Sequence, residues 1–429
     1  MEALRERLES GEIAARMGAR MDQHVRHALV GSNKILLYDA DRVAAGVKSF
    51  LIERCAVERV EAAGDFRRRV EVVGDISFVI ATDDFASVLS QLERFGGKTD
   101  VLNSGETGAQ LRLPSGVPLR VNVASQGEWG VRLIEATGSE AHLSRLGPLV
   151  SGNSEACVYR RLGLDFIPPE LREGNDEIDL AARGELPDLV CARDIRGELH
   201  AHTVSSDGKN TIAQMMDAAA ARGYEYIGIS DHSQSLKIAD GLSEEDLRAQ
   251  IRFIDKLNAG GGRIRVLKSA EVDILADGSL DYCDDLLKEL DYTVCSIHSR
   301  FGLDRLQQTE RILRAMDNRY FNLLGHATGR ILLKRPGYEI DIERIVLHAR
   351  QNGCGFEINS SPDRLDLSAE HARVARDAGV MIAITTDAHS IRDFDLLKYG
   401  IGQARRAGLQ KESVLNALHW PELKKVFTR

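Results

Sequence analysis

The spacing of apolar residues changes along the chain and divides it into stretches of different character. In residues 1–57 apolar side chains recur at helical intervals, as in MEALRERLESGEIAARMG and DADRVAAGVKSFLIERC. Between residues 58 and 125 the pattern changes to alternation and short apolar runs, which predicts strands around one helix. This stretch is expected to be a small α+β unit, with strands over 57–64, 68–82, 108–116 and 118–125 and a helix over 84–97.

After residue 125 the spacing is helical again and then becomes irregular around Pro168-Pro169 and the sequence ELPDLVCARDIRG. Irregular sequence with prolines between periodic stretches is typical of a connection between domains. We therefore expect a helical region followed by a linker, together ending near residue 195, ahead of a separate C-terminal domain.

Residues 196–429 repeat a pattern of strand, loop and helix. Alternation of strands and helices predicts a parallel sheet or barrel, and seven strands in a stretch of this length suit a barrel. The predicted strands are 197–202, 224–232, 264–272, 292–299, 322–329, 354–361 and 380–389, with helices such as 211–223, 243–259 and 369–379 between them.

Composition excludes several classes of protein. The chain has 429 residues with 43% hydrophobic and 28% charged residues, which is ordinary for a globular protein, and no apolar stretch is long enough for a membrane span. The six cysteines are scattered without a CxxC pair, so we expect a reducing, cytoplasmic setting and neither a disulfide framework nor a zinc finger. The net charge of −9 does not suggest a general nucleic-acid coat, although it leaves room for a local basic groove.

Metal-ligating residue types stand at the ends of nearly all the predicted C-terminal strands. His200 and His202 are two apart on the first strand, so alternation points both side chains to one face. Because the carboxyl ends of barrel strands open onto one mouth, the side chains at these ends are expected to converge. The full set is His200, His202, Asp207, His232, Glu271, His298, His326, Asp387 and His389.

A single histidine at a strand end is more often a hydrogen-bonded structural residue than a metal ligand. Here, however, six of the chain's 12 histidines stand at strand ends together with three carboxylates. That pattern predicts a site for two or three divalent ions, and imidazole mixed with carboxylate suits Mn²⁺, Zn²⁺ or Fe²⁺.

The motifs around these residues resemble the PHP domain, the polymerase-and-histidinol-phosphatase superfamily. The similarity covers residues 196–429 and includes all nine ligand positions, in ELHAHTVSSDG, GISDHS, AEVDIL, SIHSRF, GHATGR and TTDAH. Further segments resemble one branch in particular, the PHP domain attached to bacterial family X DNA polymerases: DGSLDY, GHATGRILLKRPGYEIDIE, EINSSPDRLDL and YGIGQARRAG.

The N-terminal part resembles the polymerase core of the same branch. GDFRRRVEVVGDISFVIA resembles the nucleotidyltransferase motif, and ATGSEAHLSRL with the segment over 159–190 resembles the thumb and connector. The resemblance thus implies helical fingers remnants over 1–57, a nucleotidyltransferase-like palm over 58–130, a thumb-like region and linker over 131–195, and a distorted (β/α)7 barrel over 196–429.

The polymerase motif departs from the family pattern at the residues that matter for chemistry. Polymerisation needs three carboxylates to hold two magnesium ions. The first is kept as Asp75, the second is Ser77, and the third aligns with Arg120. Asp65 stands where the family has a phosphate-binding serine, and Glu135-Ala136 replaces an aromatic pair. We therefore expect a core without polymerase activity.

The family's DNA-gripping helical hairpins are also affected. The first hairpin domain is expected to be missing, as in an N-terminally truncated core, and the glycine pattern of the second is degraded near RMGARMDQHV. This weakens the expectation of tight binding to gapped DNA.

The resemblance implies how the ligands divide among ions. One ion would be held by His200, His202, Glu271 and Asp387, and a second by Glu271, His298 and His326, with Glu271 as the bridge. A third would be held by Asp207, His232 and His389. A hydroxide formed between two cations would attack phosphorus, so Glu271 is assigned to catalysis, with Arg300 as a candidate for balancing charge on the phosphoryl oxygens. Asp231 is a candidate general acid, although support of a ligand histidine is its more natural role.

Basic residues beside the ligands are candidates for binding substrate phosphates. They are Arg300, Arg330, Lys334 and Arg364, and each could equally be a surface charge. Three functions remain open at this point. The first is a metal-dependent 3′→5′ exonuclease acting on single-stranded DNA or 3′ ends in repair, and the second is a small-molecule phosphatase of the histidinol-phosphatase type. The third is a scaffold with a structural metal cluster, which the complete ligand set disfavours.

Overall fold

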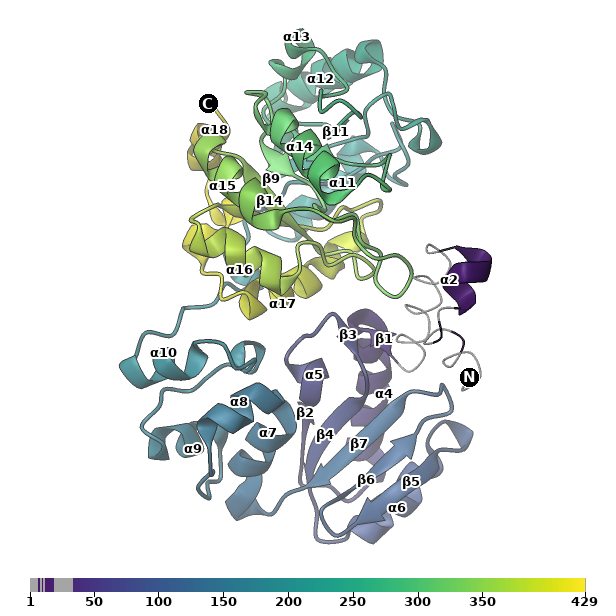
Figure 1. Ribbon diagram of the computed structural model, residues 1–429, viewed down its shortest axis with the longest axis vertical. Helices are drawn as coiled ribbons and strands as arrows, with labels where there is room; N and C mark the ends of the chain where they lie inside the picture. The colour runs from purple at the N-terminus through teal and green to yellow at the C-terminus, as the bar shows by residue number, and fades with distance from the viewer. Residues whose placement is uncertain (1–6, 8–9, 11, 19–33, 429) are drawn as a thin grey trace. The chain divides into compact units, whose positions relative to one another are not determined.

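A computed structural model of the chain describes residue 7, residue 10 and residues 12–18 and 34–428 (Figure 1). The chain forms two compact units, residues 1–187 with 332–335 and residues 188–331 with 336–429. The degraded hairpin expected over 16–25 falls largely outside the described residues. Among the described helices, none is both long enough and apolar enough to span a bilayer.

The first unit is built on a mixed five-stranded sheet. Its strand order is β2-β4-β7-β6-β5, in which β4 and β7 run parallel and the other neighbours are antiparallel. The strands are β2 (Arg59–Ala63), β4 (Ile76–Ala81), β7 (Pro118–Val123), β6 (Gly108–Arg112) and β5 (Asp100–Gly105). The interior position of β4 agrees with its sequence ISFVIA, whose six side chains are all buried.

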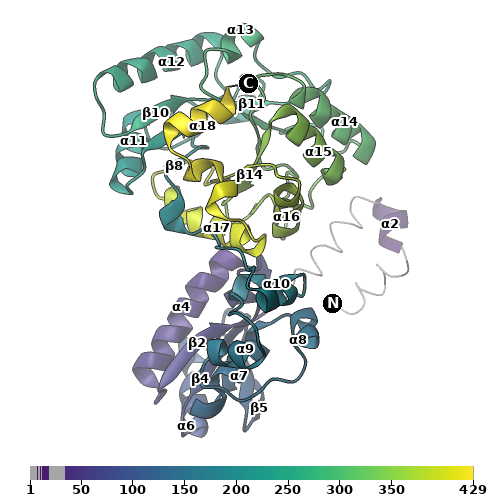
Figure 2. The same ribbon diagram turned by 90° about the vertical axis from the view of Figure 1, so that its left-hand side faces the viewer.

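Helices on the two faces of this sheet complete the unit. The 18-residue α4 (Leu37–Arg54) packs beside β2 (Figure 2). The helix α6 (Phe85–Leu92) is capped by Asp84, whose side chain accepts a hydrogen bond from the Ser87 backbone. On the other face, Trp129 and Leu133 of α7 pack on Val79 and Ala81. The remaining elements are α5 (Gly64–Arg67), α8 (Glu140–Leu146), α9 (Glu155–Arg161), α10 (Glu177–Arg183), α7 (Trp129–Thr137) and the strand pair β1 (Ile35–Leu36) and β3 (Val72–Val73).

Two details of this unit differ from the sequence expectation. The predicted strand over 68–82 is broken at Gly74 and Asp75, between β3 and β4. The edge strand β5 was not predicted, because its sequence DVLNSG is polar and largely exposed. An edge strand gains its stability from pairing with β6 and needs no apolar periodicity.

The second unit is a series of short parallel strands with helices between them. Its pairings run β8-β9-β10 and then β11-β12-β13-β14-β15, and all are parallel. Single parallel bridges His232–Glu271 and Ala201–Ala388 join the two sheets at both ends, so the series returns to its start. The strands are β8 (Gly197–Glu198), β9 (Tyr226–Ile229), β10 (Arg265–Lys268), β11 (Glu271–Asp273), β12 (Val294–Ser296), β13 (Leu323–Leu324), β14 (Gly355–Asn359) and β15 (Ile382–Thr385).

The helices of this unit are arranged around its strands (Figure 2). They bury an apolar stripe against the sheet, as when Met215 and Ala219 of α11 pack in one core with Ile227 and Ile229 of β9. The helices are α11 (Ile212–Ala221), α12 (Glu244–Ala259), α13 (Asp284–Leu287), α14 (Arg305–Met316), α15 (Ile342–Asn352), α16 (Ala369–Asp377), α17 (Leu397–Arg406) and α18 (Trp420–Phe427).

Each of the predicted C-terminal strand segments contains a strand, but the strands are shorter than predicted. The third segment is split, because Ser269 and Ala270 separate β10 from β11. Most segments lose their C-terminal residues to irregular backbone, and two of those residues, His326 and Asp387, have positive φ values of 24° and 50°. Non-glycine residues adopt such φ values rarely, and this strain concentrates at functional sites.

Candidate metal centre

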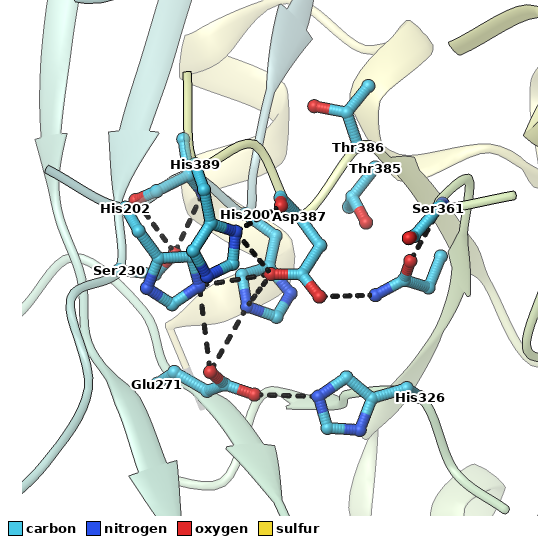
Figure 3. Close-up of polar contacts among 12 residues, drawn as sticks. His200, His202, Ser230, Glu271, His326, Ser361, Thr385, Thr386, Asp387 and His389 are labelled. Atoms are coloured by element: carbon cyan, nitrogen blue, oxygen red, sulfur yellow. Dashed lines mark hydrogen bonds and ion pairs between the residues drawn. The ribbon is translucent and has the colours of Figure 1, made fainter. Parts of the chain in front are cut away.

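The ligand-type side chains of the second unit gather at the carboxyl ends of its strands. His200 and His202 follow β8, His326 follows β13, and Asp387 follows β15 (Figure 3). They lie around Glu271 at the start of β11. His200 and His202 are 0% exposed, Glu271 is 1% exposed and His326 is 2% exposed. Burial of this much charge and polarity is costly unless the groups are paired or bind cations.

Glu271 is the centre of the cluster. Its Oε1 lies 2.8 Å from His326 Nε2 and 3.3 Å from His298 Nε2. Its Oε2 lies 2.8 Å from His232 Nδ1, and 3.5 and 3.6 Å from the Nε2 atoms of His200 and His202. A carboxylate whose two oxygens face different imidazoles has the geometry of a bridge between two cations.

Asp387 faces the same two imidazoles from the opposite side. Its Oδ1 lies 3.0 Å from His202 Nε2 and 3.5 Å from His200 Nε2 (Figure 3). Its other oxygen, Oδ2, accepts a hydrogen bond of 3.0 Å from Asn359 Nδ2. His200, His202, Glu271 and Asp387 therefore form one set of converging donor atoms.

A further set surrounds Asp207, in the loop after β8. Its Oδ2 lies 3.5 Å from His232 Nε2, and its Oδ1 lies 3.3 Å from His389 Nε2. The ring of His202 stacks on both His232 and His389, with centroid distances of 4.3 Å. The donor atoms of all four residues lie within 4.8 Å of one another.

The structure brings all nine sequence-predicted ligands together, although the sets share more members than expected. His202 belongs both to the set around Asp207 and to the set with His200 and Glu271, and His232 also lies with Glu271 and His298. Several donor atoms, among them His200 Nε2, His202 Nδ1 and His326 Nδ1, are buried and have no hydrogen-bond partner among the described residues. Such atoms fit divalent cations, which use these donor types.

The electrostatics of the cluster agree with this fit. Burial opposes ionisation of Glu271, but the imidazoles of His298, His232 and His200 outweigh burial and hold its pKa well below the usual range. Burial lowers histidine pKa values, yet the carboxylates Glu271 and Asp207 raise the pKa of His232 to about 10. In the same way Glu271 and Asp273 raise that of His298 to about 9. The carboxylates are thus ionised and ready to bind cations at neutral pH.

Sequence reasoning missed the carboxylates that orient these histidines. Glu357, fully buried on β14, accepts a hydrogen bond of 2.5 Å from His200 Nδ1 and one of 2.6 Å from the His326 backbone. Asp273 of β11 pairs with His298 Nδ1. Carboxylates behind ligating histidines fix the tautomer and ring orientation. The sequence signal that could have identified them is an acidic residue among the apolar residues of a strand, Glu357 in GFEIN and Asp273 in EVDIL.

Asp231 is buried, and both of its carboxylate oxygens accept hydrogen bonds from the protein. It is 1% exposed and accepts hydrogen bonds from the backbone and hydroxyl of Thr203, the hydroxyl of Ser206 and the amide of Gln250. With its oxygens occupied by these donors, Asp231 is suited to holding the loop after β8. Both roles that the sequence offered for Asp231, general acid and support of a ligand histidine, stay predictions.

The four basic candidates differ in their surroundings. Arg364 lies closest to the described ligands, with Nε 3.8 Å from Asp387 Oδ2. Arg300 and Lys334 are exposed. Arg330 donates hydrogen bonds to the backbone carbonyls of Arg364 and Leu365, so its guanidinium is engaged with the chain itself.

The polymerase-like position in the first unit has a different character. Ser77 on β4 is the direct cross-strand partner of Arg120 on β7, and Arg120 Nη2 lies 3.0 Å from Asp75 Oδ2. A cavity of about 410 Å³ surrounds these residues and is also lined by Asp65, Arg132 and others. A guanidinium thus occupies the place between strands where a cation would need a third carboxylate.

Comparison with known proteins places these observations in a family. The PHP domain family matches residues 198–361. The chain is 34% identical over 445 residues to the DNA polymerase/3′-5′ exonuclease PolX of Bacillus subtilis (strain 168), covering 97% of this chain and 78% of that protein. It is 28% identical over 230 residues to a probable phosphatase of Thermoanaerobacter sp. (strain X514), covering 51% of this chain and 89% of the phosphatase.

Among solved structures, the chain resembles histidinol phosphate phosphatase from Lactococcus lactis, crystallised with zinc, L-histidinol and phosphate. The TM-score is 0.39 at 15% sequence identity, over 50% of this chain and 94% of that one.

The parallel α/β unit, the PHP match and the cluster of buried imidazoles and carboxylates define a metal-dependent phosphoesterase of the PHP type. Because its similarity to PolX runs through nearly the whole chain, the protein belongs to the PHP-containing branch of the family X DNA polymerases.

Proposed function

We propose that the protein is a metal-dependent 3′→5′ exonuclease that acts on DNA ends in repair, and that its polymerase core is inactive. The observation that carries the proposal is a contrast between the units. The second unit holds a complete set of nine ligand-type side chains, whereas Arg120 pairs with the one remaining carboxylate, Asp75, in the first. The similarity to a protein named as polymerase and exonuclease spans both units and favours DNA as the substrate.

We assign the ligands to two or three ions, Mn²⁺, Zn²⁺ or Fe²⁺. Such ions, when bound, lower the pKa of a coordinated water and neutralise charge on the phosphoryl oxygens. Glu271 would bridge two of them, because its oxygens face separate groups of imidazoles. Glu357 and Asp273 would hold His200 and His298 with the correct nitrogen facing inward.

Binding of the substrate is assigned to basic side chains at the mouth of the cluster. Arg364 is close enough to Asp387 to reach a phosphate bound at the cluster. The exposed Arg300, which follows His298 closely in the chain, would contact a neighbouring phosphate. Paired guanidinium contacts to phosphate oxygens are strong because both partners are charged.

The division of the chain follows from this assignment. We interpret residues 1–57, of which 34–57 are described in full, as a fingers-like remnant, and 58–130 as a degenerate palm. Residues 131–195 are interpreted as a thumb-like region and linker, and 196–429 as a distorted (β/α)7 PHP barrel. In this interpretation the first unit serves as a platform that holds the nucleic acid without extending it.

A small-molecule phosphatase is the second candidate. It is favoured by the similarity to two probable phosphatases, which match 51% and 45% of this chain and 89% and 78% of their own lengths. The absence of a net positive charge is consistent with it as well. The similarity of the first unit to PolX has no explanation under this alternative.

A labelled oligonucleotide distinguishes the candidates. A single-stranded DNA labelled at its 5′ end is incubated with Mn²⁺ and either the wild type or His200→Ala/His202→Ala. The exonuclease proposal predicts a ladder of progressively shorter labelled products for the wild type and intact DNA for the variant. Release of a labelled mononucleotide as the first product would reverse the polarity, and an intact oligonucleotide with the wild type would overturn the proposal.

A further inference from the structure

The loop that contains Arg364 lies beside the candidate metal centre, and residues that follow another strand form hydrogen bonds with it. The loop runs from Ser360 to Leu367 between β14 and α16. Figure 3 shows Ser361, at its start, on the Asp387 side of the cluster. The Ser361 backbone donates to Asn359 Oδ1, and Asn359 Nδ2 in turn donates to Asp387.

Thr328 and Arg330, which both follow β13 in the chain, form hydrogen bonds with the C-terminal part of this loop. Arg330 donates through Nε to the Arg364 carbonyl, at 2.9 Å, and through Nη2 to the Leu365 carbonyl. Thr328 donates both its backbone N–H, at 2.9 Å, and its hydroxyl, at 2.8 Å, to Asp366 Oδ2. Asp366 is fully buried, and Leu365 adopts a φ of 42°, which an unsupported loop would not retain.

One of these hydrogen bonds, from Arg330, is made to the backbone carbonyl of Arg364 itself. Its side chain is 23% exposed, its Nε lies 3.8 Å from Asp387 Oδ2, and its guanidinium donates no hydrogen bond to any described residue. A long arginine side chain loses rotamer freedom when it binds a phosphate. A fixed backbone limits the positions that the guanidinium can occupy before binding, so less conformational entropy is lost when the phosphate binds. Arg364 is therefore held beside the ligands with its donors available.

We propose that Arg330, together with the Thr328–Asp366 pair, is a positioning element for Arg364, which binds the non-bridging oxygens of the substrate phosphate. The proposal rests on the proposed phosphoesterase function and changes the expected role of Arg330. Arg330 contacts the chain and acts through Arg364, so it sets phosphate affinity without touching the phosphate.

Binding of inorganic phosphate to the Mn²⁺-loaded full-length protein tests this by calorimetry. Removal of a charge-assisted hydrogen bond by Arg364→Gln is expected to weaken phosphate binding about tenfold. Arg330→Gln is expected to weaken it several-fold, and the double variant to be no weaker than Arg364→Gln alone, because the two residues act through one contact. Arg373→Gln is the matched control, since Arg373 also donates to a backbone carbonyl, that of Arg406, but on α16.

A milder variant and two further measurements exclude a merely structural effect. Thr328→Val removes only the hydroxyl bond to Asp366 and is expected to weaken phosphate binding about twofold. Metal content and thermal midpoint are recorded for every variant, and metal content is expected to stay at the wild-type value. Additive losses in the double variant, unchanged affinity in Arg330→Gln and Thr328→Val, or no phosphate binding by the wild type would each overturn the proposal.

The outcome is separable from that of the nuclease assay. If the wild type leaves the oligonucleotide intact, but phosphate binding shows the expected coupling between Arg330 and Arg364, the nuclease function fails and the positioning role stands.

Discussion

At the scale of single residues, the metal centre depends on buried carboxylates that do not themselves have to bind a cation. Glu357 is the clearest case, because it contacts His200 Nδ1 and the His326 backbone and also accepts a hydrogen bond of 2.5 Å from the Thr385 hydroxyl. Its pKa stays below the usual range because, although burial raises it, the charge of His200 lowers it further. An ionised Glu357 keeps the proton on His200 Nδ1 and leaves Nε2 to face Glu271.

Glu357→Gln is therefore expected to weaken metal binding by about 10–100-fold while the fold is retained. The amide preserves the shape but loses the charge that fixes the His200 tautomer. Competition with a chelator measures the affinity, and Glu310→Gln is a suitable control, because Glu310 pairs with Arg344 at the surface. Equal metal affinity in Glu357→Gln and the control would contradict this role.

At the scale of elements, strand register decides what each unit can do. In the second unit, short strands stop at the residues that bear ligands, and the ligands meet at one mouth. In the first unit, the parallel register of β4 and β7 puts Ser77 beside Arg120, and Asp75 precedes β4 on the same face. Burial raises the pKa of Asp75, and the guanidinium of Arg120 lowers it by less.

The same register predicts that two substitutions rebuild a cation site. Ser77→Asp/Arg120→Asp would place carboxylates at all three positions 75, 77 and 120, and we expect the variant to bind about one additional Mn²⁺ per chain. Paramagnetic resonance counts the bound ions, and Arg120→Ala, which leaves Asp75 as the one carboxylate among these three positions, provides the comparison. The wild type is expected to extend no primer. Equal Mn²⁺ counts in all three proteins, or primer extension by the wild type, would be incompatible with the register argument.

The elements also explain what sequence could and could not predict. The alternation of strand and helix and the histidines at strand ends were enough to place every ligand at one mouth, because barrel-like order is a local pattern repeated along the chain. The polar edge strand β5 left no such pattern. Glu357 and Asp273 were missed because their role depends on which strands become neighbours. The hydrogen bonds from Arg330 to backbone carbonyls likewise have no signature in the sequence.

At the scale of the whole molecule, the raised pKa values of the cluster's histidines link protonation to the stability of the metal-free fold. The pKa of His232 is raised to about 10, and those of His298 and His389 to about 9. For each, burial acts in the opposite direction and is outweighed by Glu271 or Asp207. A histidine whose pKa is higher in the folded than in the unfolded chain stabilises the fold below its ordinary pKa, near 6.5, and loses this contribution as pH rises through the folded value.

The metal-free protein should therefore lose thermal stability between about pH 6.5 and pH 10, whereas the Mn²⁺-loaded protein should not show this loss. The carboxylates do not alter the trend, because the pKa values of Glu271 and Asp387 are lowered and both remain ionised throughout this window. Thermal midpoints of both forms across the window measure the difference, which is expected to widen as pH rises. A constant difference would mean that the cluster does not exchange protons for metal.

The most direct test of the central claim compares two substrates under identical conditions. The Mn²⁺-loaded wild type is given the 5′-labelled single-stranded oligonucleotide and, separately, a small phosphate monoester, and kcat/KM is measured for each. We predict a clear preference for the oligonucleotide, with a ladder of shortening products that disappears in His200→Ala/His202→Ala. Efficient turnover of the monoester with the oligonucleotide left intact would contradict the nuclease account and identify the second unit as a phosphatase.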